Sequence, residues 1–152
     1  MLVLGAERVF PTLPVLERLW ALAGRPASAY APEAERQLLL TTLQAGDALA
    51  SAFYQRWAGL GQVGPKHVGY DPVERNLVRV RSVLAWLAEQ RGEGALREGV
   101  TLPGVALACL VLWADARDGL DWRRHAELDR LVGELEPRAS FRRTQPHRWS
   151  PG

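Results

Sequence analysis

The sequence is poor in sulfur: its 152 residues include one cysteine, Cys109, and one methionine. A lone cysteine excludes an intramolecular disulfide and is compatible with the reducing cytoplasm, where we expect the protein to reside. Cys109 has apolar neighbours within a helical pattern, so we expect a buried thiol with a raised pKa and little reactivity. None of His67, His125 and His147 has a second His or Cys at ligand spacing, and no metal site is expected.

Long hydrophobic runs are also missing. The longest, residues 105–114, has about half the length that a membrane span requires. The first ten residues lack a positively charged start and carry Glu7, so they do not indicate a signal peptide. We therefore expect no membrane partner. With 47% hydrophobic and 24% charged residues, the composition is that of a folded globular domain.

The sequence also lacks the common catalytic and phosphate-binding motifs. Ser51, Ser82 and Ser140 have no GxSxG surroundings that would make one of them a nucleophile. The glycines form neither a GxxxxGK[ST] loop nor a GxGxxG turn for phosphates. We therefore assign no catalytic residue and no cofactor.

The positive charge is concentrated at the C-terminus. The net charge is +2, yet residues 138–152 hold four arginines and no acid. The remaining 137 residues carry 15 basic and 17 acidic side chains. An arginine-rich tail can bind phosphate or nucleic acid, but four arginines without a groove-reading helix are weak support, so nucleic acid is a disfavoured partner.

Helical periodicity is the pattern that is present. Apolar residues recur at helical spacing, and no alternating strand is evident. We predict an all-α bundle of about five helices. They cover residues 14–23, 32–59, 72–91, 101–117 and 121–137. The predicted organisation is a short N-terminal helix and linker over 1–32, a helical bundle domain over 33–137 and a basic tail over 138–152.

Several helix ends are marked by particular residues. Asp71 can cap free amides of a helix that has Pro72 in its first turn, and Thr101 and Asp121 can cap the next two. Pro137 ends the last. The helix over 101–117 is apolar nearly all round, which predicts the buried centre of the bundle.

Some of the aromatic residues are candidates for a binding pocket. The sequence has six Trp and three Tyr, and most Trp residues fall on apolar stripes that indicate core positions. Aromatic side chains at the rim of a bundle can instead line a cleft for an apolar ligand. The candidate pocket residues are Phe53, Tyr54, Trp57 and Trp113.

The C-terminal third resembles a known family. The all-helical C-terminal domain of bacterial glutathione S-transferases commonly has a Tyr-Leu-x-x-Arg type segment, then Asp-Trp-Arg, a helix, Arg-Pro-Ser-Phe and Thr-x-Pro. Over residues 33–146 this chain resembles that domain, and it has the corresponding segments in the same order. They are Trp113–Arg117, Asp121–Arg123, Arg138–Phe141 and Thr144–Pro146.

Two departures from the family are visible. The central helix of the family usually begins with Ser/Thr-x-x-Asp, and here Gly104 occupies the Asp position. In the family, a thioredoxin-like domain holds and activates glutathione. Residues 1–32 are too few for that domain and lack its strands, so no residue inherits the activating role. Glutathione would be a co-substrate only if a thioredoxin-like domain were supplied.

Three functions remain open at this point. The first is a glutathione transferase-like helical domain that binds an apolar ligand or a partner chain and does little chemistry alone. Its partners would be a second copy in a homodimer, a thioredoxin-like chain, or a hydrophobic small molecule. The second is a truncated or split transferase whose catalytic domain is elsewhere, and the third is an Arg-tailed phosphate or nucleic-acid binder. Enzymatic activity of the chain alone stays open.

Overall fold

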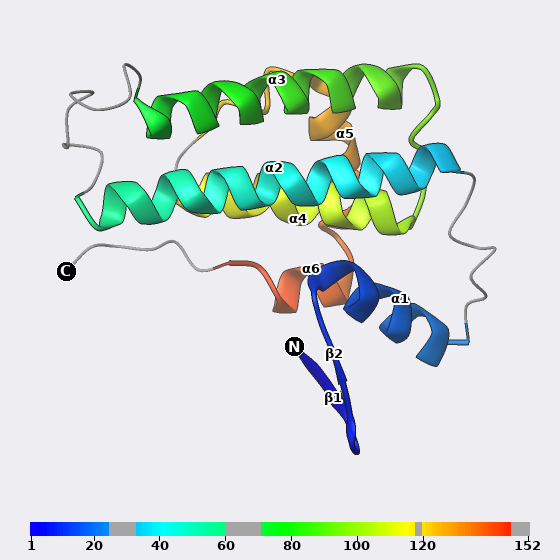
Figure 1. Ribbon diagram of the computed structural model, residues 1–152. Coiled ribbons are helices and arrows are strands. Elements are labelled where there is room, and N and C mark those ends of the chain that lie inside the picture. Colours follow the sequence, from blue (N-terminus) through cyan, green and yellow to red (C-terminus); the bar gives the residue numbers. More distant parts are fainter. Residues whose placement is uncertain (25–32, 60–70, 118–119, 147–152) are drawn as a thin grey trace.

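The computed structural model describes residues 1–24, 33–59, 71–117 and 120–146 (Figure 1). In these ranges the chain forms a two-stranded sheet followed by six helices, so the predicted all-α class is confirmed. The elements are β1 (Leu2–Leu4), β2 (Glu7–Val9), α1 (Thr12–Leu22), α2 (Glu33–Trp57), α3 (Pro72–Gly92), α4 (Leu102–Arg117), α5 (Ala126–Leu135) and α6 (Ala139–Arg143).

The two strands correct the expectation that residues 1–32 contain none. β1 and β2 pair antiparallel, with Leu2 opposite Val9 and Leu4 opposite Glu7. Gly5 adopts φ 62°, a conformation that glycine takes at little cost, and it turns the chain back within two residues. Strands of three residues are too short to show a period-2 pattern, which is why the sequence did not reveal them.

The starts of α3 and α4 follow the predicted caps. The Asp71 carboxylate accepts hydrogen bonds from the backbone N–H groups of Val73 at 2.8 Å and Glu74 at 3.3 Å. The Thr101 hydroxyl accepts from the N–H of Gly104 at 3.2 Å. A Cβ on Gly104 would lie 3.0 Å from this hydroxyl oxygen and 3.5 Å from Leu131 of α5. Gly104 therefore lets the capped end of α4 approach α5 closely.

The start of α5 differs from the prediction. Asp121 does not cap the helix, which begins at Ala126 with His125 in the N-cap position. The reason is Trp122, whose side chain is 1% exposed and belongs to the core. Residues 120–125 turn to bury it. The N–H of Trp122 donates to the Leu120 carbonyl, and the N–H of His125 donates to the Trp122 carbonyl.

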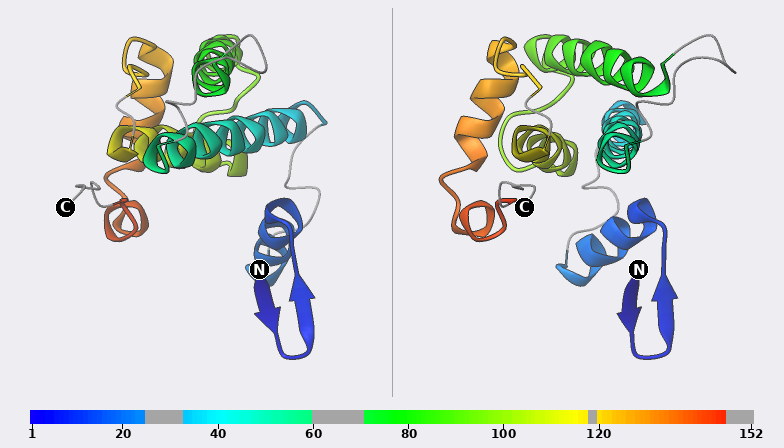
Figure 2. Two further views of the ribbon diagram at one scale, coloured as in Figure 1. Left: turned by 60° about the vertical axis from the view of Figure 1, so that its left-hand side comes forward. Right: turned by 90° about the vertical axis from the view of Figure 1, so that its left-hand side faces the viewer.

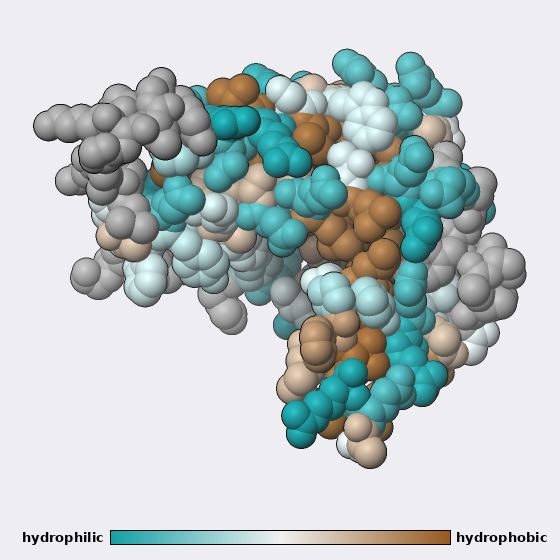
Figure 3. Space-filling model, viewed as in Figure 1, coloured by the Kyte–Doolittle hydropathy of each residue, from teal (hydrophilic) through white to brown (hydrophobic). Residues whose placement is uncertain are grey.

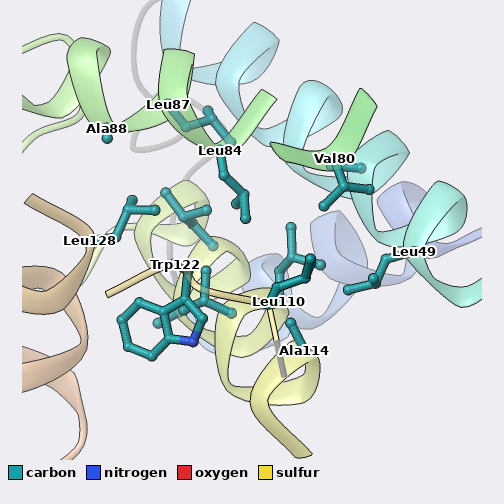
Figure 4. Close-up of a cluster of buried hydrophobic side chains, with 14 of the residues drawn as sticks. Leu49, Val80, Leu84, Leu87, Ala88, Leu110, Ala114, Trp122 and Leu128 are labelled. Atoms are coloured by element: carbon teal, nitrogen blue, oxygen red, sulfur yellow. The ribbon is translucent and has the colours of Figure 1, made fainter. Parts of the chain in front are cut away.

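The core lies among α2, α3, α4 and α5. The first three are long helices that run side by side, and α5 packs across α3 and α4 (Figure 2). Aliphatic side chains dominate, and Trp122 belongs to the same cluster as Leu84 of α3, Leu110 of α4 and Leu128 of α5 (Figure 4). The basic tail begins with α6, whose Phe141 is 9% exposed and reaches the same core.

Residues 1–24 form a unit beside the bundle, called here the N-terminal unit. α1 contacts β2, and Arg18 forms an ion pair with Glu7 at 2.8 Å. Not one residue of α1 is buried. Hydrophobic residues show on the surface of this unit and on the adjoining part of the bundle (Figure 3). The exposed ones in the unit are Met1, Val3, Phe10, Leu19 and Leu22.

Candidate binding surface

α4 is apolar on two opposite faces, but only one of them is fully covered. The buried face packs into the core and includes Leu107, Leu110, Val111 and Ala114. The opposite side, called here the outer face of α4, is partly buried at six positions and exposed at Cys109. Three of the partly buried residues, Val105, Leu112 and Trp113, also pack against the core. It carries no charged residue over four turns. The outer face consists of Leu102, Val105, Ala106, Cys109, Leu112, Trp113 and Ala116.

This arrangement corrects two expectations. The helix over 101–117 was predicted to be the buried centre of the bundle, and the structure buries seven of its residues but leaves the outer face only partly covered. Cys109 was predicted to be buried, and its residue is exposed. The pKa of its thiol is nevertheless raised from the ordinary 9.0, because neighbouring atoms partly desolvate the sulfur. The prediction of a raised pKa is thus confirmed, although the prediction of full burial is wrong.

The predicted aromatic pocket residues lie at the C-terminal ends of α2 and α4. The Phe53 ring contacts those of Tyr54 and Trp113 edge-to-face, with centroids 5.4 and 5.6 Å apart. The Arg117 guanidinium lies over the Phe53 ring at 5.8 Å. Trp57 is 64% exposed at the last residue of α2. The structure therefore brings Phe53, Tyr54 and Trp113 together, and Trp113 links this cluster to the outer face of α4.

A cavity of about 430 Å³ lies at the other end of the bundle, between the end of α3, the following loop and α5. Most of the residues that line it are charged. The lining residues are Arg91, Gly92, Gly94, Leu96, Arg97, Glu98, Glu127 and Arg130. Arg91 donates to Glu134 at 2.6 Å, Arg97 is hydrogen-bonded to Glu35, and Arg130 donates to Glu127 at 3.0 Å. Most of the charged side chains that line this cavity are therefore already engaged in ion pairs.

Neither this cavity nor the ion pairs around it could be predicted from the sequence. Glu35 is 2% exposed, and Arg97 bonds it from 62 residues further along the chain. The pKa of Arg97 is raised, mainly by its hydrogen bond to Glu35 and secondly by the negative charge of the Glu35 carboxylate. A pairing over such a separation leaves no local pattern, because the two residues meet only after α2 and α3 have packed.

The remaining candidate residues, the histidines and other possible metal ligands, do not form a common site within the described ranges. Within the described ranges, no group of three or more His, Cys, Asp or Glu side chains could hold a metal ion. His67 and His147 lie outside these ranges. His125 is half-buried, and its pKa is lowered by desolvation first and by Arg124 second. The helices of the described ranges include none that is long and apolar enough to cross a bilayer.

Comparison with known proteins adds no relative. No protein-family model matches the chain, and no curated protein or solved structure has significant similarity to it.

Proposed function

We propose that this protein is a glutathione transferase-like helical domain that acts as a binding module, with the outer face of α4 as its docking surface. The observation that carries the proposal is the contrast between the two faces of α4. A helix that is apolar all round belongs in an interior, because exposed apolar area costs about 25 cal/mol per Å². A partner that covers the outer face would complete that interior.

The shape of this surface favours a protein chain over a small molecule. The outer face extends from Leu102 to Ala116, about four helical turns or about 20 Å. A drug-sized ligand instead occupies a concave, mostly apolar pocket. The 430 Å³ cavity of the described residues is lined by charged side chains and lies at the opposite end of the helices from the aromatic cluster.

The resemblance indicates which chain would bind. In glutathione S-transferases, the helical domain packs against a thioredoxin-like domain that holds glutathione. We therefore propose a thioredoxin-like domain as the occupant of the outer face. The complex would then carry the glutathione chemistry, and the present helices would contribute the wall for an apolar acceptor, with Phe53 and Trp113 nearest to it.

Cys109 permits a direct test, because it is the single cysteine of the sequence and lies exposed on the outer face of α4. A photoreactive benzophenone maleimide is attached to Cys109, and alkaline pH offsets the slow reaction that the raised pKa causes. After irradiation in an extract of the source cells, the crosslinked peptides are identified by mass spectrometry. We expect peptides of a thioredoxin-like domain.

The control keeps the probe and changes the surface around it. Ala106→Glu places a charge one turn from Cys109 and should abolish the crosslink, whereas Ser82→Glu, at an exposed position of α3, should leave it unchanged. Peptides of unrelated abundant proteins, insensitive to Ala106→Glu, would contradict the proposal. Turnover of glutathione with a chloronitrobenzene acceptor by the chain alone would contradict it as well.

A further inference from the structure

The outer edge of β1 differs from that of β2 in the features that prevent strands from pairing. Unpaired strand edges are usually protected by charges or proline. β2 contains Glu7 and Arg8 and is followed by Pro11 after one residue. β1 reads Leu2–Val3–Leu4 and has neither charge nor proline. The β2 edge is thus protected by charge and a nearby proline, whereas the β1 edge is protected only by its length of three residues.

Hydrogen-bond geometry assigns one residue to the centre of the β1 edge. In a hairpin with a two-residue turn, the residues beside the turn form a hydrogen-bonded pair, and bonded and non-bonded pairs alternate from there. Leu4 with Glu7 is the pair beside the turn, so Val3 with Arg8 is a non-bonded pair. The N–H and C=O of Val3 therefore point away from β2.

We propose that a second copy of this chain pairs with β1 through a twofold axis centred on Val3. The two Val3 residues would exchange both backbone hydrogen bonds, as antiparallel bonded pairs do. Leu2 would then lie opposite Leu4 of the second copy. In a twofold dimer each copy contributes the same surface, so the edge of β1 would face the edge of β1 of the second copy. Because β1 has no charged residue, this contact brings no like charges together.

The resulting four-stranded sheet would close the assembly at two copies. Its outer strands would be the two β2 strands, whose charged residues and nearby Pro11 oppose further pairing. A two-stranded sheet alone is marginally stable, and additional strands stabilise it. In Figures 1 and 2 the hairpin projects away from α2, α3, α4 and α5, while α1 contacts β2. The bundle helices therefore lie at a distance from the β1 edge.

This inference is independent of the proposed function, since β1 and the outer face of α4 are different surfaces. A matched pair of variants tests it by sedimentation velocity over a concentration series. Val3→Pro removes the N–H that points outward from β1. Arg8→Pro removes the N–H directly opposite, which points outward from β2, and leaves the bonds within the hairpin equally intact.

We expect the unmodified chain to dimerise, Val3→Pro to raise the dimer dissociation constant at least about tenfold, and Arg8→Pro to change it less than about threefold. A chain that stays monomeric throughout, or equal effects of the two prolines, would overturn the inference. The crosslink from Cys109 reports on the other surface and should be unaffected by Val3→Pro.

A cysteine variant keeps the inference testable should proline unfold the hairpin. In a Cys109→Ser background, Val3→Cys would place the two Cα atoms about 5.5 Å apart across the twofold axis, which is within the range that a disulfide bridges. Mild oxidation should give a covalent dimer, and Arg8→Cys should not. Equal crosslinking of both cysteine variants would count against pairing through β1.

Discussion

Arg91 and Glu35 are buried charged residues, and each forms an ion pair with a more exposed partner. The Glu35 carboxylate is 3% exposed and is bonded by Arg97, which is itself 56% exposed, so one member of this pair remains in water. Arg91 is the reverse case, since the cation is 3% exposed and its partner Glu134 is 32% exposed. The Nε and Nη1 atoms of Arg91 have no hydrogen-bond partner among the described residues. The two ion pairs therefore have different consequences for stability.

For the Arg91–Glu134 pair, we predict that removing the anion lowers the free energy of unfolding more than removing the cation does. Glu134→Ala leaves a buried cation without its partner and should lower the free energy of unfolding by about 2–4 kcal/mol. Arg91→Met removes the cation together with its unsatisfied N–H groups and should change it by less than about 1 kcal/mol. Urea unfolding at neutral pH measures both.

An exposed pair supplies the control for this comparison. Arg130 and Glu127 lie 3.0 Å apart with side chains 60% and 27% exposed, so Arg130→Met should cost less than about 1 kcal/mol. If Arg91→Met proved as costly as Glu134→Ala, the guanidinium would contribute net stability, and the assignment of an incompletely satisfied cation would be wrong.

The helices differ in how far their sequences determine them. α3 was predictable because Asp71, Pro72 and an apolar stripe act within a few residues of one another, and local interactions suffice to define it. The start of α5 was not, because burial of Trp122 depends on helices distant in sequence and prevails over the capping preference of Asp121. The hairpin was missed because its strands are too short for a pattern.

The candidate surface shows the same limit. Periodicity identifies α4 as apolar on all sides, but it does not state which sides other elements will cover. Phe53 and Trp113 were predicted as pocket residues from their aromatic character, and their contact depends on α2 packing beside α4. The cavity beside Arg91 left no local signal at all.

Gly46 in the middle of α2 allows a prediction about helix stability. A Cβ there would lie 3.7 Å from the Leu110 side chain of α4, an ordinary contact distance. Gly46→Ala should therefore raise the free energy of unfolding by about 1 kcal/mol, because alanine has the higher helix propensity and loses no space. Urea unfolding again provides the measurement.

Gly133 in α5 is the matched comparison, since a Cβ at that position would meet no atom within 4 Å. Gly133→Ala reports helix propensity alone, and the difference between the two variants isolates the contact with Leu110. A loss of stability from Gly46→Ala with a gain from Gly133→Ala would show that α2 and α4 approach too closely for a methyl group.

At the scale of the whole molecule, the N-terminal unit and the bundle differ in how much they bury. The buried core draws all its residues from positions 38–141, and the N-terminal unit supplies none. Local opening needs less free energy where few apolar contacts must be broken. The two parts should therefore unfold in separate steps, with the N-terminal unit opening first.

Hydrogen–deuterium exchange resolved by mass spectrometry tests this order. Peptides from β1, β2 and α1 should exchange within the earliest time points, whereas those from α2, α3 and α4 should exchange only at rates set by global unfolding. If the chain pairs through β1, protection of residues 2–9 should rise with protein concentration, because pairing adds free energy only to that unit. Val3→Pro should remove this concentration dependence and leave the exchange of α2 unchanged. Equal protection of both parts at every concentration would mean that the N-terminal unit is held by the bundle, contrary to its lack of buried residues.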